Sequence, residues 1–191
     1  MLYCTCKLVI FGDTMKKLLC IVLLVFSLQV FAKNYTAKLS GTIEDGPQTT
    51  AIIQKVNSLK PGDKLTIYVN SGGGYIGTGY AMVEAIHNSK GAVIVRVNKW
   101  AASMAANLMC EAPYFSIADN AVVMFHLSSS PVFFGLFKKM NKKGDNPFTW
   151  TLLHKTFKKC KFLTDKDIEV IDSGKEVWLS GYEINERLGR I

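Results

Sequence analysis

The 191-residue chain is 49% hydrophobic, which is enough apolar material for the core of one domain. No internal repeat, low-complexity tract or linker divides it. Its formal net charge of +8 includes a lysine cluster within residues 138–161, but no nucleic-acid-binding motif accompanies that charge. We therefore exclude a nucleic-acid partner and expect the lysines on a solvated helical face, with attraction to anionic lipid headgroups as a minor alternative.

The first 32 residues have the pattern of a secretory signal peptide. A basic start at residues 15–17 leads into an almost wholly apolar run that ends with Val30-Phe31-Ala32. The predicted divisions are a non-native extension over 1–14, a signal peptide over 15–32 and a single domain over 33–191. Cleavage after Ala32 would give a periplasmic or secreted protein. The alternative is an uncleaved inner-membrane anchor, although the run is shorter than a comfortable membrane span.

After this segment, strand patterns alternate with helix patterns at short spacing. Strands are predicted over residues 35–43, 65–70, 92–98, 114–118 and 121–125, and helices over 49–59, 76–89, 105–112 and 165–171. Residues 131–161 are predicted to be helical with a break at 144–147, and residues 182–191 to close the chain with a short helix. The strand at 92–98 is β-branched, as strands buried on both faces are. The alternation predicts an α/β fold of βαβ units, with a largely parallel sheet and helices on its faces.

Ser103 lies in a run of small residues, at the point where the strand at 92–98 gives way to a helix. At such a turn, backbone N–H groups without intrahelical partners can receive an oxyanion, which suits a nucleophilic serine. The simpler interpretation is that the Ser103 hydroxyl only caps the helix.

Three glycines, Gly72 to Gly74, follow the second strand directly. Glycine permits a positive φ and a close approach of a ligand to the backbone. The spacing fits neither of the common phosphate-binding loops, so we discount nucleotide binding. The alternative is a loop whose amide faces a developing negative charge.

His126 follows the last apolar residue of a strand, where it could act as a general base. A serine and a histidine at the ends of different strands match the usual placement of a nucleophile and its base. His87 and His154 lie within predicted helices, where an exposed polar face explains them.

Two cysteines, Cys110 and Cys160, remain if the signal peptide is removed. They could form a disulfide in an oxidising compartment or remain as two buried thiols, and the sequence leaves this open. No cysteine or histidine pair has metal-ligand spacing, so we expect no metal and no cofactor.

Four segments, in order, resemble the proteolytic subunit of the Clp protease. They are residues 67–74 (IYVNSGGG), 101–105 (AASMA), 123–126 (VMFH) and the closing 178–189, which contains WLSG and ERLG. The resemblance implies the ClpP/crotonase fold, a spiral of ββα units with a parallel sheet and flanking helices. It also implies a serine peptidase in which Ser103 is the nucleophile, His126 the base, and the backbone amides of Gly74 and Met104 the oxyanion hole.

The third catalytic residue implied by the resemblance is Glu176, where the family has an aspartate, and Asp172 is the alternative acid. Gly72, Gly73 and Tyr75 would bind the substrate, on an edge where an extended peptide can pair as a strand. The resemblance also implies a homo-oligomer. Residues 144–147 interrupt the helix that joins two rings in the family, so the sequence leaves open whether a double ring forms.

These features together predict an exported serine endopeptidase that cleaves peptides or unfolded polypeptides through an acyl-enzyme. Because a periplasm has no ATP supply for an unfoldase, we expect ATP-independent action and no unfoldase partner. Two alternatives remain. One is a peptidase of the signal peptide peptidase A type, which pairs serine with a distant lysine, and the other is a catalytically inactive member of the fold that binds peptides.

Overall fold

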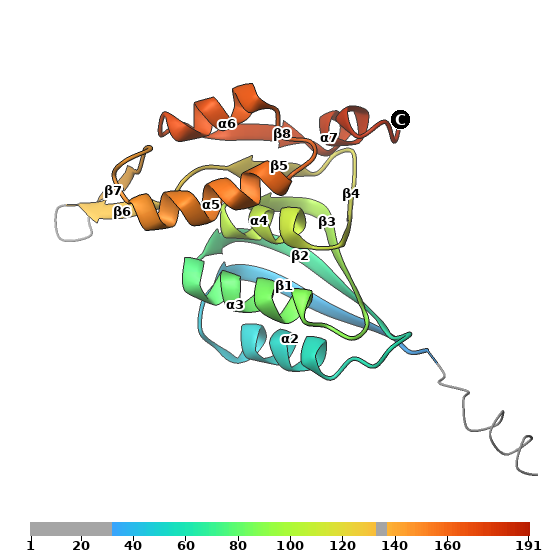
Figure 1. Cartoon of the computed structure of the whole chain (residues 1–191). Coiled ribbons are helices and arrows are strands. Elements are labelled where there is room, and N and C mark those ends of the chain that lie inside the picture. Colours follow the sequence, from blue (N-terminus) through green and yellow to red (C-terminus); the bar gives the residue numbers. More distant parts are fainter. Residues whose placement is uncertain (1–31, 133–136) are drawn as a thin grey trace, which may run out of the picture. The chain divides into compact units, whose positions relative to one another are not determined.

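The computed structural model describes residues 32–132 and 137–191 (Figure 1). The predicted extension and signal peptide therefore lie outside the described residues, apart from Ala32. Within the described ranges, no helix is both long enough and apolar enough to cross a membrane.

Strands and helices alternate over residues 34–117, and three further strands follow before the next helix. The strands are β1 (Asn34–Ile43), β2 (Lys64–Gly74), β3 (Ala92–Ala102), β4 (Tyr114–Ile117), β5 (Val122–Phe125), β6 (Ser129–Val132), β7 (Phe137–Met140) and β8 (Val177–Ser180). The helices are α2 (Pro47–Asn57), α3 (Ile76–His87), α4 (Met104–Glu111), α5 (Pro147–Lys159), α6 (Asp165–Asp172) and α7 (Gly181–Arg187).

The main sheet has the strand order β1-β2-β3-β5-β8, with β4 also paired to β3. Every pairing in it is parallel except the one between β5 and β8 at the edge. The α/β fold with a mostly parallel sheet and flanking helices, predicted from the alternating patterns, is confirmed.

The helices cover one face of this sheet. On β2 and β3, the alternate residues that point toward the helices are buried: Leu65, Ile67, Val69, Val93, Val95 and Val97. The residues between them face the other way, and Arg96 and Asn98 are exposed. The prediction that residues 92–98 are buried on both faces is wrong, because the helices of the described chain pack on one side only.

The segment between β5 and α6 differs most from its prediction. Residues 131–161 were expected to be helical, but the antiparallel hairpin of β6 and β7 comes first, and α5 begins only at Pro147. Pro147 is a favourable first helical residue, and the side chain of Asn146 caps the helix by accepting from the Thr149 N–H at 3.0 Å. The expected break at 144–147 is therefore the start of α5.

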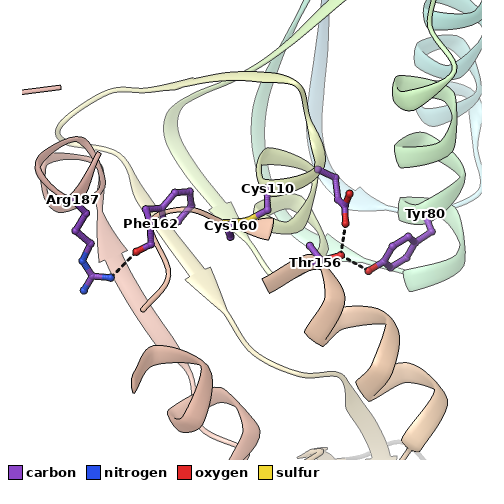
Figure 2. The surroundings of a disulfide bond; sticks show 7 residues. Tyr80, Cys110, Thr156, Cys160, Phe162 and Arg187 are labelled. Atoms are coloured by element: carbon purple, nitrogen blue, oxygen red, sulfur yellow. Dashed lines mark hydrogen bonds between the residues drawn. A yellow bond between two sulfur atoms is a disulfide. The ribbon is translucent and has the colours of Figure 1, made fainter. Parts of the chain in front are cut away.

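A disulfide joins the C-terminal ends of α4 and α5, since Cys110 and Cys160 are bonded with their Cα atoms 4.7 Å apart (Figure 2). Beside it, the carboxylate of Glu111 accepts from the Lys159 ammonium and the Thr156 hydroxyl, both at 2.6 Å. The Thr156 hydroxyl also lies 2.7 Å from that of Tyr80 on α3, and burial raises the pKa of Tyr80. This end of α4 is thus fixed to two neighbouring helices.

Candidate active site

Ser103 stands between the last residue of β3 and the first residue of α4, with φ 55° and ψ −125°. Among the described residues it is the one non-glycine with a positive φ. Its N–H donates to the Met124 carbonyl of β5 at 2.8 Å, and its own carbonyl accepts from the Asn107 N–H at 3.1 Å. A non-glycine residue held in this conformation costs about 1–3 kcal/mol, and such residues concentrate at functional sites.

The Ser103 hydroxyl makes no capping hydrogen bond with α4. This removes the simpler interpretation of the serine as a helix cap. Ser103 instead lines a cavity of about 230 Å³ together with His126, Gly74 and Met104. Four residues predicted from three separate motifs thus line one cavity.

The glycine stretch is part of a strand, which corrects the predicted loop. β2 continues to Gly74, and Thr42 and Ile43 of β1 pair with Gly73 and Gly74. A Cβ on Gly73, whose φ is 89°, would lie 2.6 Å from the Ala102 carbonyl oxygen and 2.8 Å from the Ser103 Cβ. On Gly74 it would clash with the Ile43 backbone. Glycine is required here because β2 passes directly against β1 and the serine turn.

The two predicted oxyanion-hole residues directly follow Gly73 and Ser103, which lie against one another. Met104 is the first residue of α4, so its N–H has no acceptor within the helix, and its side chain is buried. Gly74 is the last residue of β2 and lines the same cavity. Both residues therefore line the cavity that Ser103 lines.

His126 directly follows β5 and is partly buried. In the parallel register between β3 and β5, Ala102 pairs with Met124. Ser103 and His126 thus continue two adjacent strands past their carboxyl ends, where parallel strands in α/β sheets place their sites.

The two candidate acids differ in their position relative to His126. Phe125 pairs with Val177 in the antiparallel β5–β8 ladder, so His126 and Glu176 are the next residues along the two strands. Residues opposite one another in such a ladder share a face. The Glu176 carboxylate accepts from the Trp178 indole N–H at 2.9 Å, on an exposed part of that face.

Asp172 has a different environment at the end of α6. Its carboxylate accepts from the Trp150 indole N–H at 2.8 Å and lies 3.6 Å from Nδ1 of His154. In the part of the chain that the structure describes, no hydrogen bond or ion pair links either Asp172 or Glu176 to His126. The register places Glu176 next to His126, and the contacts of Asp172 tie it to α5.

The remaining predicted residues have clear positions. Gly72 is exposed next to Trp100, and Tyr75 is 66% exposed at the mouth of the cavity. His87 lies half-exposed on α3, as expected, and its Nε2 donates to the Glu111 carbonyl at 2.9 Å. His154 is mostly buried and stacks on Trp150, which corrects its assignment to an exposed helical face.

Three polar residues near the cavity were not singled out from the sequence. The hydroxyl of Ser71 donates to the Gly41 carbonyl at 2.5 Å and accepts from the Gly73 N–H at 3.1 Å, so it fixes the end of β2. Asn107 and Ser128 line the cavity wall. The position of Asn107 four residues after Ser103 on a helix is the one signal in the sequence that could have indicated it. Across the described ranges, no group of acidic, histidine or cysteine side chains has the arrangement of a metal site.

Comparison with known proteins identifies the family and the fold of the chain. The sequence model of the Clp protease family matches residues 27–134, a range that includes Ser103 and His126 but ends before both candidate acids. Among solved structures, a mutant of ClpP1 from Listeria monocytogenes is similar in fold, with a TM-score of 0.62 and 18% sequence identity over 80% of this chain and 86% of that chain. A search of the curated proteins found no match.

Proposed function

This chain belongs to the Clp protease family, and on that premise we propose that it is a serine endopeptidase that cleaves peptides or unfolded polypeptides through an acyl-enzyme. One observation carries the proposal. Ser103 is held in a strained backbone conformation with a hydroxyl that does not cap α4, and it shares one cavity with His126, Gly74 and Met104. The resemblance predicted from the sequence motifs is confirmed at the level of family and fold.

In the proposed reaction, the Ser103 oxygen attacks the peptide carbonyl carbon while His126 takes the hydroxyl proton. The amides of Gly74 and Met104 donate to the resulting oxyanion, and the loss of one such donor costs roughly 10²–10³-fold in rate. His126 then gives its proton to the departing amine, and an ester on Ser103 remains. A water that loses its proton to His126 hydrolyses this ester and restores the serine.

Glu176 is the proposed third member, since the β5–β8 register supports its position beside His126. A rotation of its side chain away from the Trp178 indole would bring the carboxylate toward the imidazole. There it would orient His126 and stabilise the imidazolium. Asp172 is the weaker candidate, because its contacts are with Trp150 and His154 of α5 and no strand register supports a position beside His126.

The substrate is proposed to pair as an extended strand beside Gly72, Gly73 and Tyr75. The register between β2 and β3 ends at Ser71 and Ala101, so the backbone of the following glycines continues beyond that pairing. The sheet face without helices includes the contacting rings of Trp100 and Trp178, with centroids 5.5 Å apart. Burial of this face against a second copy would support the proposed homo-oligomer.

Export to a periplasmic or secreted location is proposed from the pattern of residues 15–32. The Cys110–Cys160 disulfide supports it, because disulfides persist mainly in oxidising compartments. Action without an ATP-dependent unfoldase follows from such a location.

Of the two alternative functions, the serine–lysine peptidase has less support than the catalytically inactive, peptide-binding protein. A serine–lysine peptidase needs a lysine near Ser103, and none occurs among the described residues that line the cavity. A catalytically inactive, peptide-binding protein is favoured by the bond of Glu176 to Trp178 instead of His126.

Labelling with a fluorophosphonate separates these functions, because the reagent reacts with an activated serine. We expect the wild-type protein to be labelled, and both Ser103→Ala and His126→Ala to lose the label. Glu176→Gln and Asp172→Asn then identify the acid, and we expect the larger loss for Glu176→Gln. A folded wild-type protein that does not react would support the peptide-binding alternative.

A further inference from the structure

Asn107 is a buried amide in an otherwise apolar part of α4. It is 2% exposed, and the neighbouring residues from Met104 to Met109 are buried and apolar. Its side-chain oxygen accepts no hydrogen bond from any residue that the structure describes. A buried amide left in this state is destabilising, and asparagine is also a poor helix former. Such a residue calls for an explanation other than stability.

The place of Asn107 on α4 puts it beside the proposed nucleophile. Residues four apart on a helix lie one above the other on the same face, and the Asn107 N–H donates to the Ser103 carbonyl at 3.1 Å. Both residues line the same cavity. The side chain of Asn107 is therefore one helical turn from the serine, at the wall of the cavity in which a substrate would lie.

The rest of the cavity is polar but uncharged. Ser128 and Ser129 contribute hydroxyls, and the Ser128 oxygen accepts from the Asn141 side-chain amide at 2.7 Å. Ile76, Leu127 and Leu153 supply apolar walls. The described lining includes no carboxylate, lysine or arginine. At about 230 Å³, compared with roughly 30 Å³ for one water in the liquid, the cavity can take a side chain.

We propose that Asn107 forms the base of a specificity subsite, which takes an uncharged side chain that donates a hydrogen bond, glutamine or asparagine, from the residue on the acyl side of the bond that Ser103 attacks. This rests on the proposed peptidase function. The Asn107 oxygen is closed to solvent in the free protein, and it pairs with a donor from the substrate when the side-chain amide rotates to face the cavity. An apolar side chain leaves that oxygen unpaired, and a cationic or anionic side chain finds no opposite charge among the described residues that line the cavity.

The test uses two peptidyl phosphonate diphenyl esters that differ only in the acyl-side residue, glutamine in one and methionine, of similar length, in the other. Ser103 displaces phenoxide from the phosphorus of either ester. The rate of this reaction is followed as the decrease in the fraction of protein that fluorophosphonate can still label. For the wild-type protein we expect the glutamine reagent to react at least about tenfold faster, as one hydrogen bond allows. In Asn107→Leu the ratio should fall to one or below.

Asn185 provides a matched control, because it is another buried asparagine in a helix but has partners. Its amide donates to the Asp119 carboxylate at 2.8 Å, away from the cavity. Asn185→Leu should lower Tm and leave the glutamine-to-methionine ratio unchanged. Asn107→Leu should raise Tm by about 2–4 °C, because it removes an unpaired amide. If Asn107→Leu does not fold, Asn107→Ala removes the same acceptor.

The outcomes separate the two proposals. A wild-type protein that reacts with fluorophosphonate but shows no preference for glutamine would overturn the subsite and leave the peptidase function standing. A preference that persists in the Asn107 variant would also overturn it. A folded wild-type protein inert to fluorophosphonate would remove both.

Discussion

The two ends of α4 are built in opposite ways. At the first end, Ser103 has a positive φ and a hydroxyl that does not cap the helix, and one turn later Asn107 has an unpaired oxygen. At the last end, Cys110 is in a disulfide and Glu111 has hydrogen bonds or ion pairs to three other residues. This short helix thus has a strained first end and a last end that is held by a disulfide, a hydrogen bond and ion pairs.

This difference indicates how the strain at Ser103 is maintained. α4 has eight residues, so its ends are only about 12 Å apart. The bonds from Cys110 and Glu111 to α5 and α3 fix the far end, and the Ser103 N–H bond to β5 fixes the near one. A residue in an unfavourable conformation persists only where its surroundings determine it in this way.

The largest expected effect concerns Ser103 itself. Ser103→Ala should lower the rate of peptide cleavage or labelling by about 10⁴-fold or more, as losses of serine nucleophiles do. The free energy of unfolding of the Ser103→Ala protein should hardly differ from that of the wild type, because no capping hydrogen bond is lost. Ser103→Gly should raise that free energy by about 1 kcal/mol, since glycine adopts the conformation without strain. Urea denaturation measures both.

Ser180 is the matched control, because it precedes α7 with an ordinary φ of −77° and its side chain accepts from the Glu183 N–H. Ser180→Ala should cost about 1 kcal/mol and Ser180→Gly a few tenths. Equal responses to glycine at the two serines would contradict the strain at Ser103.

The next largest effect is expected from the disulfide. Cys110 and Cys160 are 50 residues apart, and closing a loop of that length stabilises a domain by about 4 kcal/mol in the chain-entropy description. Reduction of the wild-type protein, or the double variant Cys110→Ala and Cys160→Ala, should lower the free energy of unfolding by an amount of this order.

The double variant also supplies the control for reduction. A reductant should shift the denaturation midpoint of the wild-type protein and leave that of the double variant unchanged. If the wild-type midpoint does not move, the far end of α4 does not depend on this bond.

The fold could be predicted because it depends on local patterns, and the candidate residues of the site were identified from motifs that resemble the Clp protease. The apolar alternation in β2 and β3 and the small residues around Ser103 are visible without knowledge of the tertiary structure. The same was not true of residues 131–161, where the aromatic and basic side chains fit a helical pattern, although Pro131 stands in the strand β6.

Features that depend on distant parts of the chain could not be predicted. Whether Cys110 meets Cys160 depends on how α5 packs on α4, and the position of Glu176 depends on the register of β8. The importance of Asn107 requires knowledge of the cavity, because an asparagine on a helix is otherwise expected to face solvent.

A smaller effect is expected at Glu111. Glu111→Gln removes the charge that pairs with Lys159 at 2.6 Å, in a side chain that is only 3% exposed. Because it breaks a buried, charged hydrogen bond, it should lower the free energy of unfolding by about 2 kcal/mol. Asp165 pairs with Lys158 at the same distance but is 85% exposed, and this bond lowers the pKa of Asp165.

Asp165→Asn should therefore leave the denaturation midpoint unchanged, since solvent screens an exposed ion pair. The two ion pairs have the same length, so the comparison measures the effect of burial together with the further bonds of Glu111 to Thr156 and His87. Similar losses for both variants would mean that Glu111 is not a special anchor of α4.

The smallest expected effect is at Ser71, which supports the strained end from β2. Its buried hydroxyl joins the Gly41 carbonyl of β1 to the Gly73 N–H, and Gly73 lies directly against Ser103. Ser71→Ala should lower the free energy of unfolding by about 1 kcal/mol. It should also slow fluorophosphonate labelling roughly tenfold, because a small displacement of Gly74 misplaces an oxyanion donor.

Ser40 distinguishes this positioning role from a general loss of stability. Its hydroxyl donates to Gln48 at 3.3 Å on the exposed side of β1, so Ser40→Ala should change neither the labelling rate nor the midpoint. Urea that lowers wild-type stability by the amount lost in Ser71→Ala gives a second control. If this treatment slows labelling as much as the variant does, Ser71 acts through stability alone. If the variant is slower, the bond from Ser71 to Gly73 holds the strained end in its reactive geometry, as the Cys110 disulfide fixes the other end.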